Sequence, residues 1–90
     1  MNKLEEAREI INNVDKEMIN LFISRMKASK LVAEYKKENN LPILDQKRED
    51  LIIEKNLNLL NNEEISQYYL EWFKTLLKVS KEYQTKLNED

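Results

Sequence analysis

The chain contains no glycine and a single proline, Pro42, among its 90 residues. Phosphate-binding loops and most tight hairpin turns depend on glycine, because glycine adopts backbone conformations that other residues avoid. Long stretches free of glycine and proline favour helices, whose interiors both residues destabilise. The sequence therefore predicts an all-α chain with few breaks, and it excludes glycine-rich nucleotide-binding motifs.

Cysteine and histidine are also absent. This removes disulfides, thiolate nucleophiles, cysteine-rich metal sites and the commonest general base and metal ligand. Fifteen basic and 17 acidic residues give a net charge of −2, whereas nucleic-acid-binding domains usually carry a basic excess. No apolar run approaches the ~18 residues of a membrane span, and the first ten residues have no apolar signal core. We expect a cytoplasmic protein that binds neither nucleic acid nor membranes.

Apolar residues recur at alternating spacings of three and four from Lys3 to about Lys37. This pattern predicts one long helix with a continuous apolar seam, typical of helices that pair along their length. Such a helix is ~52 Å long, whereas a compact domain of this size has a radius of gyration of only ~12 Å. The rest of the chain is too short to cover the seam, so we expect the long helix to pack along its copy in a homodimer. The seam residues are Leu4, Ala7, Ile11, Val14, Met18, Leu21, Ala28, Val32 and Tyr35.

Two shorter helices are expected after Pro42, which prevents the first helix from continuing beyond about residues 38–40. Asp45 is suited to cap a second helix that runs to about Leu60. A third helix is expected from about Asn62 to Leu87, with Asn61 and Glu64 at the spacing of a capping box. The predicted inward positions are Glu49, Ile52, Ile53, Leu57 and Leu60 on the second helix, and Ile65, Tyr69, Trp72, Phe73, Leu76, Tyr83 and Leu87 on the third. No linker or repeat interrupts this pattern, so residues 1–90 are predicted to form a single domain.

Several polar residues fall on faces that are otherwise apolar, which is where function departs from simple core packing. Arg25 lies within the seam, Glu49 lies in the apolar row of the second helix, and Ser80 and Gln84 lie one turn apart on the third. Each also has a structural explanation. A seam arginine can set the register of paired helices, a buried serine or glutamine can bond to backbone, and a glutamate can extend to the surface.

Arginine is scarce: the chain has 12 lysines but only Arg8, Arg25 and Arg48. A lysine-rich composition would explain the scarcity, but arginine is also the residue that binds carboxylates through a fixed planar fork. Arg25 and Lys36 are 11 residues apart, about three helical turns, so they share a face and could converge on a small anion. Arg8 is rotated by roughly 100° from that face, so it cannot easily serve the same pocket from the same chain, but it could serve the pocket of a partner chain.

These residues together resemble the AroQ class of chorismate mutases, small all-helical dimeric enzymes of phenylalanine and tyrosine biosynthesis. The resemblance spans about residue 4 to residue 87 and includes the strings NNVDKEMINLF, which contains Asp15, and LPILD, which ends at Asp45. It departs at Ala7, where many members carry a larger aliphatic residue. The resemblance implies an intertwined homodimer of three-helix chains, and a single chorismate mutase domain without dehydratase, dehydrogenase or regulatory regions. The site residues it implies are Arg25, Lys36, Asp45, Arg48, Glu49, Ser80 and Gln84 from one chain and Arg8 from the other.

The reaction implied by the resemblance is the intramolecular rearrangement of chorismate to prephenate, which needs no nucleophile, proton transfer, metal or cofactor. A chain without histidine or cysteine can therefore still be an enzyme. The implied catalytic residues are Arg25, Lys36 and Gln84. The same resemblance implies that the substrate carboxylates are bound by Arg25, Arg48, Ser80 and the partner's Arg8. It implies that the ether oxygen accepts hydrogen bonds from Lys36 and Gln84, and that Glu49 and Asp45 bind the ring hydroxyl.

Two other functions stay open from the sequence. An isochorismate-pyruvate lyase has a similar fold and a similar cationic pocket, and no motif separates it from the mutase. A non-catalytic helical dimerisation module would also fit the seam, although it would tolerate lysine at all three arginine positions. Incubation with chorismate and with isochorismate, each alone, distinguishes the three.

Overall fold

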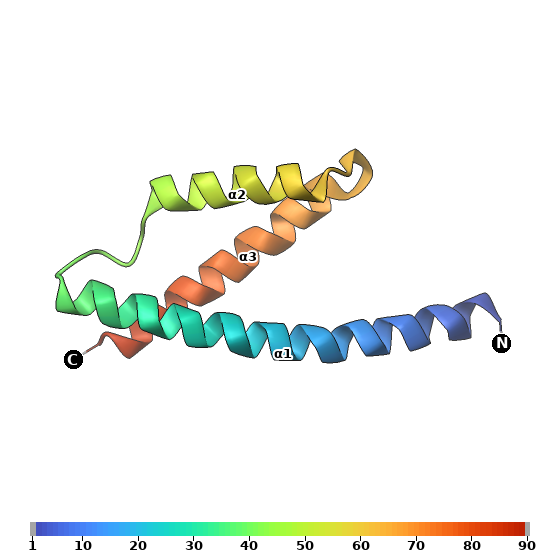
Figure 1. Ribbon diagram of the computed structural model, residues 1–90, viewed down its shortest axis with the longest axis horizontal. Coiled ribbons are helices and arrows are strands. Elements are labelled where there is room, and N and C mark those ends of the chain that lie inside the picture. The colour runs from blue at the N-terminus through green and yellow to red at the C-terminus, as the bar shows by residue number, and fades with distance from the viewer. Residues whose placement is uncertain (1, 90) are drawn as a thin grey trace.

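The structure is a computed structural model that describes residues 2–89. It consists of three helices, α1 (Lys3–Glu38), α2 (Gln46–Leu60) and α3 (Glu63–Leu87), as Figure 1 shows. The prediction of an all-α chain with one long N-terminal helix is confirmed. The predicted domain of residues 1–90 includes Met1 and Asp90, which lie outside the described residues.

The ends of the first two helices follow the predicted signals. The backbone of Asn40 is left-handed, with a φ of 54°, and Pro42 follows within the short connection to α2. Asp45 caps α2 as predicted: its side chain accepts a hydrogen bond from the backbone N–H of Arg48 at 3.1 Å. The cap therefore sets the start of α2 at Gln46.

The predicted start of α3 is wrong in one detail. Asn61 does not form a capping box with Glu64, because Asn61 closes the preceding helix: its φ is 45° and its N–H bonds to the carbonyl oxygen of Leu57. Asparagine adopts this left-handed conformation more readily than most residues. Asn62 is the N-cap of α3 and makes no side-chain capping bond. The connection between α2 and α3 is therefore only two residues long.

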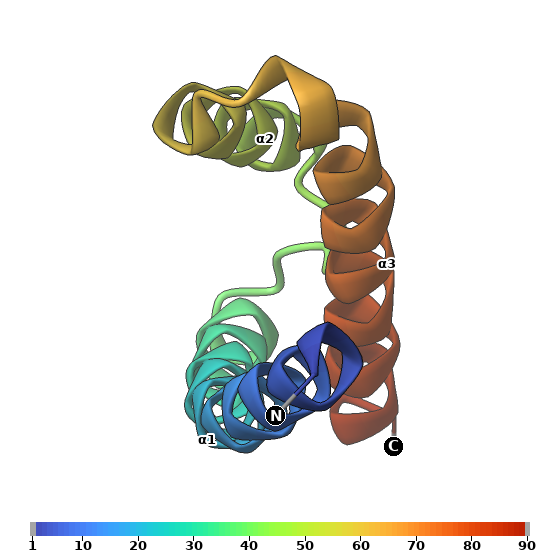
Figure 2. The same ribbon diagram turned by 90° about the vertical axis from the view of Figure 1, so that its right-hand side faces the viewer.

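Helix α3 is the element on which the other two pack. Within residues 2–89, α1 and α2 each contact α3 and do not contact one another. Figure 2 shows both on the same side of α3, near its two ends. The N-terminal part of α1 extends beyond the other two helices (Figure 1), and the chain has dimensions of 55 × 26 × 15 Å and a radius of gyration of 16.4 Å. A compact chain of this length would have a radius of about 12 Å.

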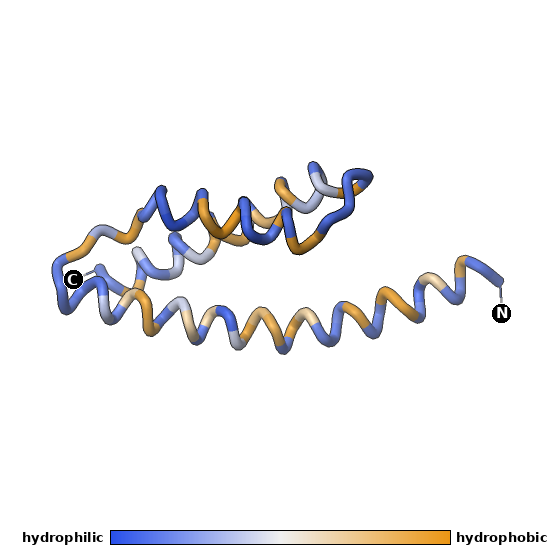
Figure 3. Tube along the Cα trace, turned by 45° about the horizontal axis from the view of Figure 1, so that its top comes forward, coloured by the Kyte–Doolittle hydropathy of each residue, from blue (hydrophilic) through white to orange (hydrophobic). Residues whose placement is uncertain are grey.

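The core of the single chain is small. Its buried apolar side chains are Ala33, Phe73 and Leu77. All nine residues of the predicted seam on α1 are exposed, which confirms that the chain alone does not cover them. Figure 3 shows apolar residues recurring along α1 into the part that extends past the other helices. Over the described residues, no helix combines the length and the apolar composition needed to cross a membrane.

The predicted inward face is correct for α2 and only partly correct for α3. All five predicted positions on α2 are half-buried, and on α3 Phe73 is buried. Ile65, Trp72 and Leu87 are exposed instead, and Leu77 is buried although it was not predicted. The reason is that α3 borders two separate hollows. Leu77 lines the cavity described below together with Ser80 and Gln84, whereas Trp72 lines an open apolar groove with Met18, Leu21 and Phe22 of α1.

Candidate active site

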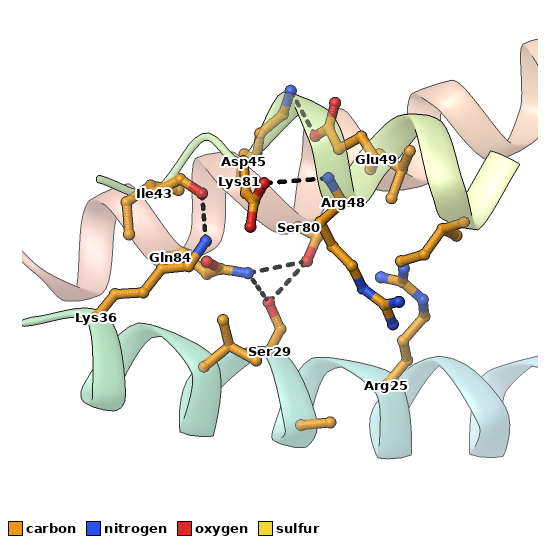
Figure 4. A pocket seen from close by; sticks show the side chains of 14 residues that line it. Arg25, Ser29, Lys36, Ile43, Asp45, Arg48, Glu49, Ser80, Lys81 and Gln84 are labelled. Carbon is orange, nitrogen blue, oxygen red and sulfur yellow. Dashed lines mark hydrogen bonds and ion pairs between the residues drawn. The ribbon is translucent and has the colours of Figure 1, made fainter. Parts of the chain in front are cut away.

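A cavity of about 450 Å³ lies among the three helices and the connection between α1 and α2 (Figure 4). The structure brings seven of the eight predicted site residues to its wall, and these are Arg25, Lys36, Asp45, Arg48, Glu49, Ser80 and Gln84. The eighth, Arg8, does not line it. Arg8 is exposed on the extended part of α1, 17 residues or about 26 Å along the helix from Arg25.

Helix α1 supplies two cations to the cavity. Arg25 is half-buried, and its guanidinium carbon lies 5.7 Å from the centre of the Phe73 ring, within the range of a cation–π contact. Lys36 donates a hydrogen bond to the carbonyl oxygen of Ile43 at 2.6 Å. Because Ile43 lies in the connection that leads to Asp45, Lys36 also fixes the entry into α2.

A buried polar cluster joins α1 to α3 at the floor of the cavity. Ser29, Ser80 and Gln84 are only 5%, 6% and 7% exposed. The two hydroxyl oxygens are 2.7 Å apart, and the Gln84 amide nitrogen donates to Ser29 Oγ at 2.8 Å and more weakly to Ser80 Oγ at 3.4 Å. Ser29 lies between Arg25 and Lys36 on α1 and was not among the site residues predicted from the sequence. Its bonds across the helix interface were not apparent from sequence, because they depend on how α3 docks.

Helix α2 faces the cavity with its first turn. Glu49 is paired with Lys81 of α3, with 2.9 Å between Nζ and Oε1, and their side chains are 16% and 35% exposed. Lys81 was missed from sequence because lysine carries most of the surface charge of this chain. The signal that could have found it is its position directly after Ser80 and one turn after Leu77, on the face of α3 that the site uses.

The charges around the cavity are unequal. Four cations line it, and both carboxylates that line it are engaged: Asp45 caps α2, and Glu49 is paired with Lys81. Figure 4 shows the side chains of Arg25 and Arg48 pointing toward one another from α1 and α2. Among the described residues, neither guanidinium forms an ion pair with a carboxylate. Two like charges that converge without a counter-ion favour the binding of a small anion, above all a carboxylate.

Residues 2–89 contain no group of three or more acidic, histidine or cysteine side chains arranged to hold a metal ion. What the cavity offers a ligand is therefore hydrogen-bond donors, positive charge and an apolar surface that includes Val32, Ile43 and Ile52.

A comparison with known protein families identifies the family of this chain. The model described as "Chorismate mutase type II" matches residues 7–85, a span that includes all eight predicted site residues. The chain belongs to the chorismate mutase type II family. The resemblance stated from the sequence is thereby confirmed.

The curated relatives of this chorismate mutase type II chain are longer proteins, each named "Bifunctional chorismate mutase/prephenate dehydratase". The one from Buchnera aphidicola subsp. Schizaphis graminum is 38% identical over 69 residues, which cover 77% of this chain and 18% of the relative. The one from Aquifex aeolicus is 41% identical over 59 residues, which cover 66% and 16%. The one from Buchnera aphidicola subsp. Baizongia pistaciae is 37% identical over 71 residues, which cover 78% and 19%. The matches thus span less than a fifth of these relatives, and no solved structure matches the chain.

Proposed function

We propose that the chain is a chorismate mutase, in which residues 1–90 form one domain that converts chorismate to prephenate. The observation that carries this proposal is the convergence of Arg25 and Arg48 on one cavity without a carboxylate partner. Chorismate carries two carboxylates, and planar guanidinium groups bind carboxylates through paired hydrogen bonds. The family and the names of the relatives support the same activity.

The proposed reaction moves no atoms in or out of the substrate. One C–O bond of the ether bridge breaks while one C–C bond forms, so the enzyme needs to hold the compact conformer and to stabilise the charge that develops on the ether oxygen. Arg25 and Arg48 serve the first task by binding the carboxylates. Lys36 and Gln84 are the donors suited to the ether oxygen, and Glu49 is the acceptor suited to the ring hydroxyl.

The remaining proposed residues support these contacts. Asp45 holds the first turn of α2 through its cap, so the positions of Arg48 and Glu49 depend on it. Ser80 offers a hydroxyl at the floor of the cavity, close to Gln84. These roles agree with the resemblance described above, and the proposal includes no metal or cofactor.

We propose further that two chains form an intertwined homodimer in which Arg8 completes the partner's cavity. The exposed seam on α1 and the groove beside Trp72 are apolar surfaces of the kind that a second copy would bury. Arg8 has no route to the cavity of its own chain, since it lies far along a continuous helix. Sedimentation that gives a stable monomer at micromolar concentration would contradict the dimer.

The assay that tests the proposed function uses two substrates. Purified protein is incubated with chorismate alone and with isochorismate alone, and the products are separated by chromatography. Prephenate from chorismate supports the proposal. Pyruvate with salicylate from isochorismate would indicate the lyase of similar fold, and no product from either substrate would indicate a dimerisation module.

Replacement of Arg25 by lysine keeps the charge but removes the planar fork. We expect Arg25→Lys to lose at least ~2 kcal/mol of transition-state stabilisation, or roughly 30-fold in kcat/KM, on the scale of charge-assisted hydrogen bonds. Steady-state kinetics with chorismate measure this loss. Lys27→Arg and Lys30→Arg, at exposed positions on the same helix, are the matched controls and are expected to change little. Wild-type kinetics for Arg25→Lys would mean that Arg25 only sets the register of α1.

The ion pair between Lys81 and Glu49 gives a second prediction. Removal of this cation by Lys81→Met frees the Glu49 carboxylate and lowers the positive charge of the cavity, so we expect KM for chorismate to rise about twofold to fivefold, the scale of a partly exposed ion pair. Lys78→Met is the matched control, because it removes the same charge one turn earlier, where the lysine is 75% exposed and pairs with the surface residue Glu82. An equal effect of both variants would show that net charge alone is responsible.

A further inference from the structure

The carbonyl oxygen of the Gln84 side chain, Oε1, is buried and has no hydrogen-bond partner. The amide nitrogen of the same side chain donates into the pair of serine hydroxyls, at 2.8 Å to Ser29 Oγ. A buried carbonyl without a donor is unfavourable, and such exceptions in a folded protein have a specific cause. The hydrogen bonding of the Gln84 side chain is therefore incomplete.

The two serine hydroxyls include a second group without a hydrogen-bond partner. Two hydroxyls 2.7 Å apart share one hydrogen between them, so either Ser29 or Ser80 has a proton left to donate. The Gln84 nitrogen also donates to this pair and cannot accept a hydrogen bond. The remaining hydroxyl proton therefore has no acceptor among the described residues. One side of the cluster lacks an acceptor while the other side lacks a donor.

A half-turn of the Gln84 amide about its last side-chain bond resolves both defects. Oε1 then takes the place of Nε2 and accepts the proton of Ser29, while Ser80 donates to Ser29 Oγ. Oε1 and both serine hydroxyls have partners in this arrangement. The amide nitrogen moves to the former place of Oε1, where no described residue accepts from it, so its two N–H groups are the donors that a ligand acceptor would satisfy.

We infer that Ser29 is a positioning residue, whose hydroxyl donates to Gln84 Oε1 and so holds the amide nitrogen toward the ether oxygen of the substrate. The inference rests on the proposed function, since it requires an acceptor of that kind in the cavity. Ser29 comes from α1 and Gln84 from α3, so the bond also couples the position of the amide to the docking of the two helices. Ser80 is a poorer candidate for this task, because its contact with the Gln84 nitrogen is longer, at 3.4 Å.

The test replaces Ser29 by alanine. Without this hydroxyl the amide samples both orientations, so we expect kcat to fall about threefold to tenfold, the scale of one neutral hydrogen bond, while KM stays within about twofold. Circular dichroism should show that the variant stays folded, since alanine is the better helix former and Ser80 still contacts Gln84. Ser24→Ala, the same change at an exposed position of α1, is the control and should leave the kinetics unchanged.

A double-variant cycle separates positioning from general packing. If Ser29 acts through Gln84, the Ser29→Ala change should lower kcat in the wild-type background and have no effect in the Gln84→Ala background. Equal losses in both backgrounds would overturn the positioning role. An active wild-type enzyme with unchanged kcat in Ser29→Ala would overturn this inference alone, whereas a wild-type protein that forms no prephenate would overturn the proposed function and this inference together.

Discussion

Two inactive variants, Arg8→Ala and Arg25→Ala, are expected to regain activity when they are combined in one dimer. Each variant alone should lose at least ~100-fold in kcat/KM, because each removes a charged ligand from both sites. In the mixed dimer one site carries both changes and the other carries neither. Since the two sites of a symmetric dimer are equivalent, the intact one should restore up to about half of the wild-type activity.

The geometry of α1 explains this expectation. The helix is continuous from Lys3 to Glu38, so Arg8 cannot fold back to the cavity lined by Arg25. If Arg8 acted within its own chain, the mixed dimer would carry one change in each site and would stay inactive. The experiment unfolds and refolds the two proteins together, confirms the heterodimer by mass, and measures prephenate formation. A confirmed heterodimer without activity would contradict the assignment of Arg8 to the partner's site.

The helices were predictable from sequence because their ends carry local chemical signals. Pro42 and Asp45 act through their own backbone and side-chain geometry, and the structure places the end of α1 and the start of α2 where these signals predicted. Asn61 shows the limit of such signals. The same residue type can cap the start of one helix or end another in a left-handed turn, and the helix on either side decides between them.

The site was partly predictable for a different reason. Arg25, Glu49 and Gln84 were visible because they are polar residues at apolar positions. Lys81 was not visible, since it resembles the surface lysines of α3 until Glu49 of another helix is known to lie 2.9 Å away. Hydropathy identifies which residues avoid water but not which neighbour covers them. This is why Trp72 was predicted to face inwards, although it is 53% exposed in the single chain.

Replacement of Gln84 by glutamate should make the activity depend on acid. The ether oxygen only accepts hydrogen bonds, and an amide donates at every ordinary pH, whereas a carboxyl group donates only when it is protonated. The ordinary pKa of glutamic acid is ~4.3, so at neutral pH the variant would place a carboxylate beside an oxygen that is gaining negative charge. We expect Gln84→Glu to lose about 100-fold or more in kcat/KM at neutral pH, on the scale of one lost oxyanion donor.

Acidification should reverse that loss, because the active form of the Gln84→Glu variant is the protonated one. Activity is therefore present below the pKa of the introduced carboxyl group and is lost as the pH rises through it. Two influences act on this pKa: burial among Ser29 and Ser80 favours the neutral acid, whereas the cations that line the cavity favour the carboxylate. The wild-type amide has no proton to titrate, so the kcat/KM of the wild type should not show this loss of activity with rising pH.

The measurement is kcat/KM against pH for the wild type, Gln84→Glu and Gln67→Glu, with circular dichroism to define the range in which each stays folded. Gln67→Glu is the matched control, since it makes the same chemical change at an exposed position of α3 outside the cavity. Its profile should follow the wild type, because a surface carboxylate at that position does not reach the substrate. If Gln84→Glu matches the wild type at neutral pH, or gains no activity in acid while still folded, Gln84 does not donate to the breaking bond. The inference for Ser29 would then fail as well, because it acts only through the orientation of that amide.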